Sequence, residues 1–211
     1  GIWDDVRTYF DTPDVYPVPP PVGTIVHDLF VDTDNTGIAS HTPDVDIVGG
    51  GWADVGSFPV EIVLNRATVP TSASPWDGIA AIETNESDVF ISANVAMPTS
   101  SYSVGIVFRH IDIDNYWRAI IDTGPARNYL RLTKVVAGVE TDVQTDSTPS
   151  YAQNQNYLMT ITLSGDTIAV VDDNGGSVGT TSTDHNTATE HGIWLTKVNT
   201  YITSVASITI Q

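Results

Sequence analysis

Four short segments between Asp88 and Gly138 alternate apolar and polar residues, and only turn residues separate them. They are residues 89–95, 103–109, 116–121 and 129–136, and they are rich in β-branched and aromatic side chains. Successive side chains of a strand point to opposite faces of a sheet. The period of two therefore predicts antiparallel strands that each bury one face.

The same alternation predicts further strands along the chain, and no segment shows a 3.6-residue period. The Gly165-Asp166 pair predicts a tight hairpin turn, and residues 172–176 predict another turn with left-handed backbone. We expect the first and last strands to pair, because chain ends usually lie close together. The predicted fold is an all-β, two-sheet antiparallel jelly-roll sandwich. Its other strands are expected at residues 25–30, 60–64, 78–83, 157–163, 167–171, 192–195 and 204–210.

Residues 1–23 differ from this pattern, and they predict an extended arm in front of a sandwich over residues 24–211. Prolines are too dense between residues 13 and 21 for a helix or a central strand. The large apolar groups of this arm either pack on the sandwich or dock on a neighbouring subunit. We favour docking, because a stiff proline spacer is suited to reaching another molecule. The predicted assembly residues are Trp3, Tyr9, Phe10 and Tyr16.

The composition of the chain limits the kinds of molecule that it can bind. The 211 residues carry 26 acidic against 8 basic side chains, a formal net charge of −18 at pH 7. Nucleic acid and anionic membranes are therefore unsuitable partners, since both require a basic surface. The chain has no cysteine, which excludes disulfides and thiolate metal sites. No apolar run approaches the roughly 20 residues of a membrane helix, so we expect no membrane insertion, and no segment has the pattern of a signal peptide.

Five segments resemble laminin-G-like, concanavalin A-like sandwich domains of the kind found in phage virion and bacterial surface proteins. They are residues 30–36, 40–44, 49–52, 105–109 and 114–117. The resemblance covers about residues 24–211 and leaves the arm outside. It implies two stacked antiparallel sheets. It also implies one of four roles: binding sugars, binding proteins, hydrolysing glycans or decorating a particle.

Catalytic patterns are missing from the sequence. Hydrolases that resemble this sandwich carry a Glu-x-Asp-x-x-Glu spacing, which supplies the two carboxylates of a retaining glycosidase. Here Glu83 and Glu86 lack the central aspartate, and Asp112 and Asp114 lack a glutamate. No Gly-x-Ser-x-Gly motif is present, and the five histidines have no spacing that ties them to a nucleophile. The sequence predicts a protein that is not an enzyme.

Metal binding has one candidate. Asp32, Asp34 and Asn35 precede Gly37 and concentrate hard oxygen ligands in one turn, which suits calcium. The alternative is an ordinary turn rich in Asp and Asn. His185 and His191 lack a third zinc ligand. We therefore expect no required cofactor, with calcium as the candidate metal.

Sugar binding requires an exposed aromatic ring beside hydrogen-bonding groups. Trp52, Trp76 and Tyr102 lie in turn-rich stretches and are the candidate glycan platform, with a packed or interface role as the alternative. Trp117 and Trp194 lie inside strand patterns and are expected in the core.

These observations favour a non-enzymatic structural or adhesive protein, located outside the cell or on a virion surface. Its partners would be other subunits of the same assembly, or a scaffold protein, contacted through the N-terminal arm. A carbohydrate-binding module that recognises a surface glycan is the alternative, and a glycoside hydrolase is the third hypothesis.

Overall fold

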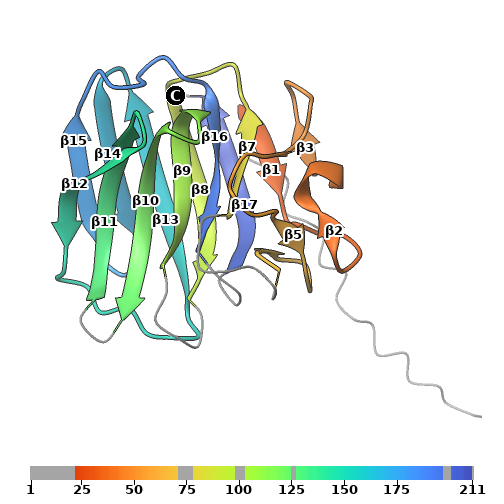
Figure 1. Ribbon diagram of the computed structural model, residues 1–211, viewed down its shortest axis with the longest axis horizontal. Coiled ribbons are helices and arrows are strands. Elements are labelled where there is room, and N and C mark those ends of the chain that lie inside the picture. Colours follow the sequence, from red (N-terminus) through yellow and green to blue (C-terminus); the bar gives the residue numbers. More distant parts are fainter. Residues whose placement is uncertain (1–21, 71–77, 98–102, 125–126, 197–200, 211) are drawn as a thin grey trace, which may run out of the picture.

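The computed structural model describes residues 22–70, 78–97, 103–124, 127–196 and 201–210 (Figure 1). Strands dominate this part of the chain, and its one helix is a 3-10 turn, Ile38–Ser40. Within these ranges no helix is long and apolar enough to cross a membrane.

One sheet has seven antiparallel strands in the order β12-β11-β10-β9-β16-β7-β4. Their bounds are β4 Ala53–Asp54, β7 Gly78–Glu83, β9 Ser103–Asp112, β10 Asn115–Gly124, β11 Arg127–Val136, β12 Val139–Asp146 and β16 Glu190–Leu195. Three of the four segments that first indicated strands are therefore consecutive neighbours, β9, β10 and β11, with two residues of sequence between one strand and the next.

The other sheet has ten strands, in the order β15-β14-β13-β8-β17-β6-β5-β2, with β1 pairing β17 and β3. The bounds are β1 Thr24–Asp28, β2 Thr36–Gly37, β3 Val45–Asp46, β5 Glu61–Ile62, β6 Ala67–Thr68, β8 Val89–Ala96, β13 Asn156–Ser164, β14 Thr167–Asp172, β15 Ser177–Thr181 and β17 Tyr201–Ile210. The segment from β1 to β6 lies at one side of the sandwich, in orange in Figure 1.

The core lies between the two sheets, which are stacked one in front of the other in Figure 1. Met159 and Ile161 of β13 and Ile106 and Phe108 of β9 belong to one buried cluster that joins both sheets. Each such side chain contributes about 1.5–3 kcal/mol when it is fully buried. The predicted two-sheet antiparallel sandwich is confirmed.

Several local predictions are also confirmed. Strands β1 and β17 pair, with Thr24 opposite Thr209. Gly165 has a φ of 53° in the two-residue turn between β13 and β14, and Gly175 has a φ of 92° in the turn that follows β14. Positive φ favours glycine because a Cβ atom would crowd the backbone there.

Other strands differ from the prediction. The expected strand at 25–30 ends at Asp28, because Phe30 has a φ of 54°. The expected strand at 60–64 is reduced to Glu61–Ile62, because Leu64 and Asn65 have φ values of 53° and 56°. Strands β12 and β15 were not predicted. Seven of the eight residues of β12 are polar or exposed, so no buried alternation marks it.

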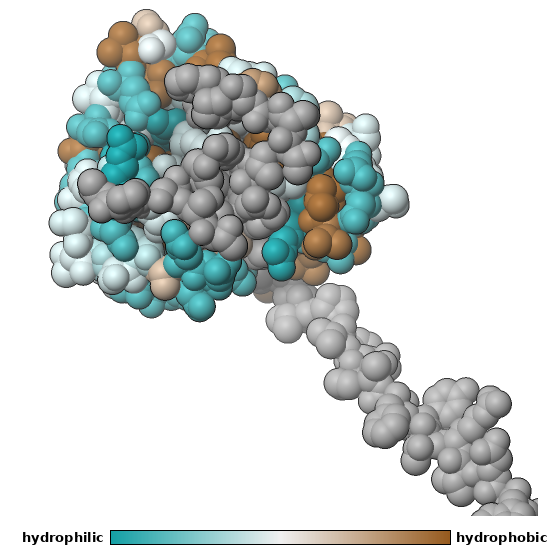
Figure 2. All heavy atoms as spheres, turned by 60° about the horizontal axis from the view of Figure 1, so that its bottom comes forward, coloured by the Kyte–Doolittle hydropathy of each residue, from teal (hydrophilic) through white to brown (hydrophobic). Residues whose placement is uncertain are grey.

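Polar residues, in teal, and pale residues of intermediate hydropathy cover most of the described surface in Figure 2, and brown hydrophobic residues form small groups between them. Exposed apolar side chains such as Ile47, Leu64 and Val139 come from different elements or loops. Apolar residues scattered in this way are normal on the surface of a folded protein.

Candidate functional site

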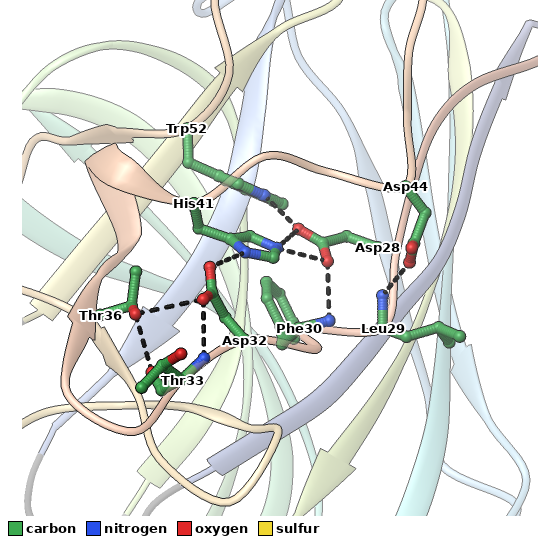
Figure 3. A network of polar contacts seen from close by, with 9 residues as sticks. All are labelled: Asp28, Leu29, Phe30, Asp32, Thr33, Thr36, His41, Asp44 and Trp52. Carbon is green, nitrogen blue, oxygen red and sulfur yellow. Dashed lines mark hydrogen bonds and ion pairs between the residues drawn. The ribbon is translucent and has the colours of Figure 1, made fainter.

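A buried carboxylate organises the segment that connects β1 to β4, which we call segment 29–52. Asp28 is the last residue of β1 and is 0% exposed. Its Oδ1 accepts a hydrogen bond from the main-chain N–H of Phe30 at 2.7 Å, and its Oδ2 accepts one from Trp52 Nε1 at 2.6 Å. The side chains of His41 and Trp52 both point toward this carboxylate (Figure 3).

His41 lies between two carboxylates. Its Nε2 is 2.9 and 3.0 Å from the two oxygens of Asp28, and its Nδ1 is 3.0 Å from Asp32 Oδ2. Asp32 Oδ1 also accepts from the main-chain N–H of Thr33 at 2.7 Å and from Thr36 Oγ1 at 3.3 Å. Asp28, Asp32, His41 and Trp52 form the group that we call the His41 network.

The surroundings shift the pKa values of all three ionisable groups in this network. Burial raises the pKa of Asp28, against the opposing effect of its hydrogen bonds from His41, Phe30 and Trp52. Burial alone would lower the pKa of His41, but its hydrogen bonds to Asp28 and Asp32 outweigh burial, and the pKa is raised. The hydrogen bond from His41 lowers the pKa of Asp32. The imidazolium form of His41 is therefore favoured.

Trp52 is a core residue, which corrects the expectation of an exposed ring at this position. Its side chain is 2% exposed, and the indole packs against the fully buried Phe30 with ring centroids 5.8 Å apart. The ring is buried because its one polar atom finds Asp28 as an acceptor. Trp76 and Tyr102, the other candidate platform residues, lie outside the described residues.

A pocket of about 510 Å³ opens beside the network. Ser40 and Thr42 lie on its wall and are exposed, with hydroxyl groups that can both donate and accept hydrogen bonds. Asp46 also lines the pocket and fixes the glycine turn, because its two oxygens accept from the main-chain N–H groups of Gly49 and Gly51, each at 2.9 Å. We call this the 39–51 pocket. Its complete lining is Ala39, Ser40, His41, Thr42, Pro43, Asp46, Gly49, Gly50 and Gly51.

The candidate calcium ligands turn toward different partners. Asp32 contacts His41, whereas Asp34 Oδ1 accepts from the main-chain N–H of Leu64 at 2.7 Å. Asn35 has a φ of 69°, and its main-chain N–H donates to the carbonyl of Ile62. Across the described ranges, no group of three or more His, Asp or Glu side chains is arranged to hold a metal ion.

The other residues weighed for chemistry have structural partners. Glu83 Oε1 accepts from the main-chain N–H groups of Thr84 and Asn85. His191 Nε2 lies 3.0 Å from the carbonyl oxygen of Glu86, and His185 Nε2 lies 3.1 Å from the carbonyl oxygen of Val135. These contacts are those of side chains that hold turns and strands in place.

A second polar group lies on the outer face of the seven-stranded sheet and was not found from the sequence. Arg118 of β10 lies 2.6 Å from Glu140 of β12, and its guanidinium stacks 4.2 Å from the ring centroid of Trp194 of β16. Asp122 and Arg131 occupy the same face, on β10 and β11. These five residues form the outer-face cluster. The sequence contains one sign of this cluster, which is that charged residues alternate with the core residues along β10 and β11 and so share the outer face.

Three polar atoms of this cluster are buried without a hydrogen-bond partner. They are Asp122 Oδ2, Arg131 Nε and Trp194 Nε1. Trp194 is 3% exposed, so the expectation that it is buried is confirmed, although it lies outside the main core. Unpartnered buried polar atoms are rare in folded proteins, and a bound water molecule or ion is one explanation for them.

No family model matches the chain, and no curated protein sequence matches it. Solved structures do share its fold. A carbohydrate-binding module, CBM66 from Bacillus subtilis, is 13% identical with a TM-score of 0.54 over 75% of this chain and 92% of that chain. The exoplasmic/lumenal domain of VIP36 in its Ca²⁺/Man3GlcNAc-bound form is 11% identical with a TM-score of 0.57, over 76% and 86%. Its Ca²⁺/Man-bound form is 13% identical with a TM-score of 0.55, over 78% and 82%.

At these identities the likeness establishes the fold alone. The chain shares the two-sheet antiparallel jelly-roll sandwich fold of these structures. The three structures are not described as laminin-G domains or virion proteins, so that part of the resemblance stays a prediction.

Proposed function

We propose that this protein is a carbohydrate-binding module and that the 39–51 pocket is its binding site. The observation that carries the proposal is an open polar pocket whose wall is held by a buried hydrogen-bond network, on a sandwich of the lectin type. This replaces the structural or adhesive role as the leading hypothesis.

The size and lining of the pocket suit a sugar. A volume of about 510 Å³ lies in the usual range for small ligands. The hydroxyl groups of Ser40 and Thr42, together with the main-chain groups of the glycine turn, can exchange hydrogen bonds with sugar hydroxyls. Because His41 and Asp46 are held by other contacts, the wall is arranged before a ligand arrives.

The similar structures support the same class of ligand. One is named a carbohydrate-binding module, and another carries Man3GlcNAc. Binding without catalysis fits the Glu83 carboxylate, whose Oε1 accepts from the main-chain N–H groups of Thr84 and Asn85.

The outer-face cluster is a second candidate location on the same molecule. Its three unpartnered buried atoms favour a ligand or water that offers both donors and acceptors, as a hydroxyl group does. The pocket is preferred because it is open, whereas Arg118, Asp122 and Trp194 are all buried.

A glycan array probed with the full chain tests the proposal, followed by calorimetric titration with the sugar that binds. The double variant Ser40→Ala/Thr42→Val should weaken binding at least about tenfold, since two hydrogen bonds to hydroxyls are lost. The variant Arg131→Ala should leave affinity unchanged. If Arg131→Ala weakens binding and the double variant does not, the binding site is the outer-face cluster. If no glycan on the array binds, the proposed function is contradicted.

The same titration, repeated with a chelator, tests whether binding needs calcium. Asp32 contacts His41, so the pocket does not need a metal ion to hold its shape. We expect equal affinity with and without a chelator. A loss of binding in the chelator would instead assign calcium a role in this protein.

Assembly through the N-terminal arm remains a separate proposal. Trp3, Tyr9, Phe10 and Tyr16 lie outside the described residues. Their aromatic content and the proline spacer support docking on another subunit or on a scaffold protein, at a cell surface or on a virion.

A further inference from the structure

The contacts of His41 require a charged ring when Asp28 and Asp32 are both ionised. A neutral imidazole has one N–H donor and one acceptor nitrogen, whereas an ionised carboxylate only accepts. Both ring nitrogens of His41 lie within 3.0 Å of carboxylate oxygens, on Asp28 and on Asp32. Loss of one proton would therefore place a nitrogen lone pair against a carboxylate oxygen, and that contact would change from attractive to repulsive.

The network joins segment 29–52 to the sandwich at two points. Asp28 belongs to β1, which pairs with β17 in the ten-stranded sheet, whereas His41 and Trp52 belong to the segment itself. Ser40, His41 and Thr42 line the pocket directly, and Trp52 follows its last lining residue. Any release of His41 would therefore move the pocket wall.

We propose that the His41 network is a pH-sensitive lock, which holds the 39–51 pocket in shape while the His41 ring is charged and releases it when the ring is neutral. The lock is a property of the free protein. Its role in controlling ligand binding rests on the proposed function.

The ionisable groups around His41 define the pH window. Asp28 and Asp32 face the ring. Asp46 lines the pocket and its carboxylate accepts from the glycine turn, whereas the carboxylate of Asp44 accepts from the main-chain N–H of Leu29. The pKa of His41 is raised above its ordinary value of 6.5. The stabilisation is therefore complete below about pH 6.5 and is lost as the pH rises through the raised value. At the acidic end the contribution of Asp32, whose pKa is lowered, is lost as that carboxylate becomes protonated.

Nuclear magnetic resonance of the unmodified full chain gives the first test. The ring of His41 should carry hydrogens on both nitrogens at pH 6 and should titrate above pH 6.5. Amide hydrogen exchange in segment 29–52 should accelerate between pH 6.5 and the pKa of His41, after correction for the intrinsic pH dependence of exchange. The acceleration should be up to about tenfold per pH unit, because each opening of the segment releases one proton from His41. Amides of the β13–β14 hairpin serve as the internal reference.

Two variants separate the lock from a general pH effect. His41→Gln should abolish the pH dependence of exchange in segment 29–52, because glutamine does not titrate. His185→Gln is the matched control, since His185 Nε2 lies 3.1 Å from the main-chain carbonyl oxygen of Val135 and makes no hydrogen bond to a carboxylate there. It should leave that dependence intact.

The outcomes are distinct. A His41 ring that is neutral at pH 6, or segment exchange that follows the hairpin at every pH, would overturn the lock. If the lock is present but no glycan binds at pH 6 or pH 9, only the proposed function fails. If both hold, affinity for the bound glycan should fall over the same pH range.

Discussion

Asp28 shows how a single buried charge can be tolerated. An ionised carboxylate loses several kcal/mol of hydration when it is buried, and this loss is offset only by good hydrogen bonds. Asp28 accepts from Phe30 and Trp52 and contacts the charged ring of His41. Removal of any one donor therefore leaves part of a buried charge unsatisfied.

Trp52→Phe tests this balance at a single atom. The phenyl ring keeps the contact with Phe30 but removes the N–H that donates to Asp28. A hydrogen bond to a charged group contributes about 1.5–3 kcal/mol, so we expect the free energy of unfolding to fall by that amount. Urea denaturation with an unchanged m-value would measure it.

Trp117→Phe is the matched comparison. Its indole N–H donates to the main-chain carbonyl of Asp184, a neutral acceptor, at 2.9 Å. Its loss should cost about 1 kcal/mol. If the free energy of unfolding falls by the same amount in both variants, the charge on Asp28 does not strengthen its hydrogen bond from Trp52.

At the scale of elements, side chains from the edge strand of one sheet cover the edge strand of the other sheet. Strand β15 ends the ten-stranded sheet and β12 ends the seven-stranded sheet. The main-chain N–H of Gly179 donates to Gln144 Oε1 at 2.7 Å, and that of Ser177 donates to Asp146 Oδ2 at 3.0 Å. Side chains of β12 thus occupy main-chain donors that would otherwise be open to another strand.

The double variant Gln144→Ala/Asp146→Ala should expose this edge. Asp146 also accepts from the main-chain N–H of Thr148, so three hydrogen bonds are lost. We expect the unfolding free energy to fall by about 1.5–4.5 kcal/mol and aggregation to be faster above 40 °C. Thioflavin binding and light scattering follow the aggregation. Thr141→Ala, an exposed position on the same strand, should behave as the unmodified protein does. Equal aggregation of both variants would contradict edge protection.

The strands of the core were predictable because each has its own signal. In β13, buried and exposed residues alternate, and the sequence alone contains that period. Strand β12 has no such signal, since its pairing with β11 and its contact with β15 depend on the assembled sheets. Local pattern therefore predicts strands that bury a face and misses strands that mainly close an edge.

The candidate site was not predictable in the same way. Asp28 bonds to His41, which is 13 residues away in the sequence, and to Trp52, which is 24 residues away. Only the fold brings these three side chains together. Trp52 was singled out as an aromatic residue in a turn-rich stretch. Its burial depends on an acceptor that the sequence pattern does not place nearby.

At the scale of the whole molecule, the sandwich has its first strand at Thr24. We expect deletion of residues 1–23 to leave the sandwich folded and to abolish self-association of the full chain. Size exclusion with light scattering measures both proteins, and thermal unfolding checks the fold. If the shortened chain loses cooperative unfolding, the arm belongs to the core. If neither protein associates, the arm has another partner or packs on its own sandwich.

The pairing of β1 with β17 also makes the fold suitable for rearrangement. The main-chain N–H of Ile210 donates to the carbonyl of Gly23, so the two ends of the sandwich lie beside each other. A short linker could join them, and new ends could open in the exposed turn at Gly165, because no strand would be cut. Because its two ends lie beside each other, the sandwich could also be inserted as a domain into one surface loop of a host protein.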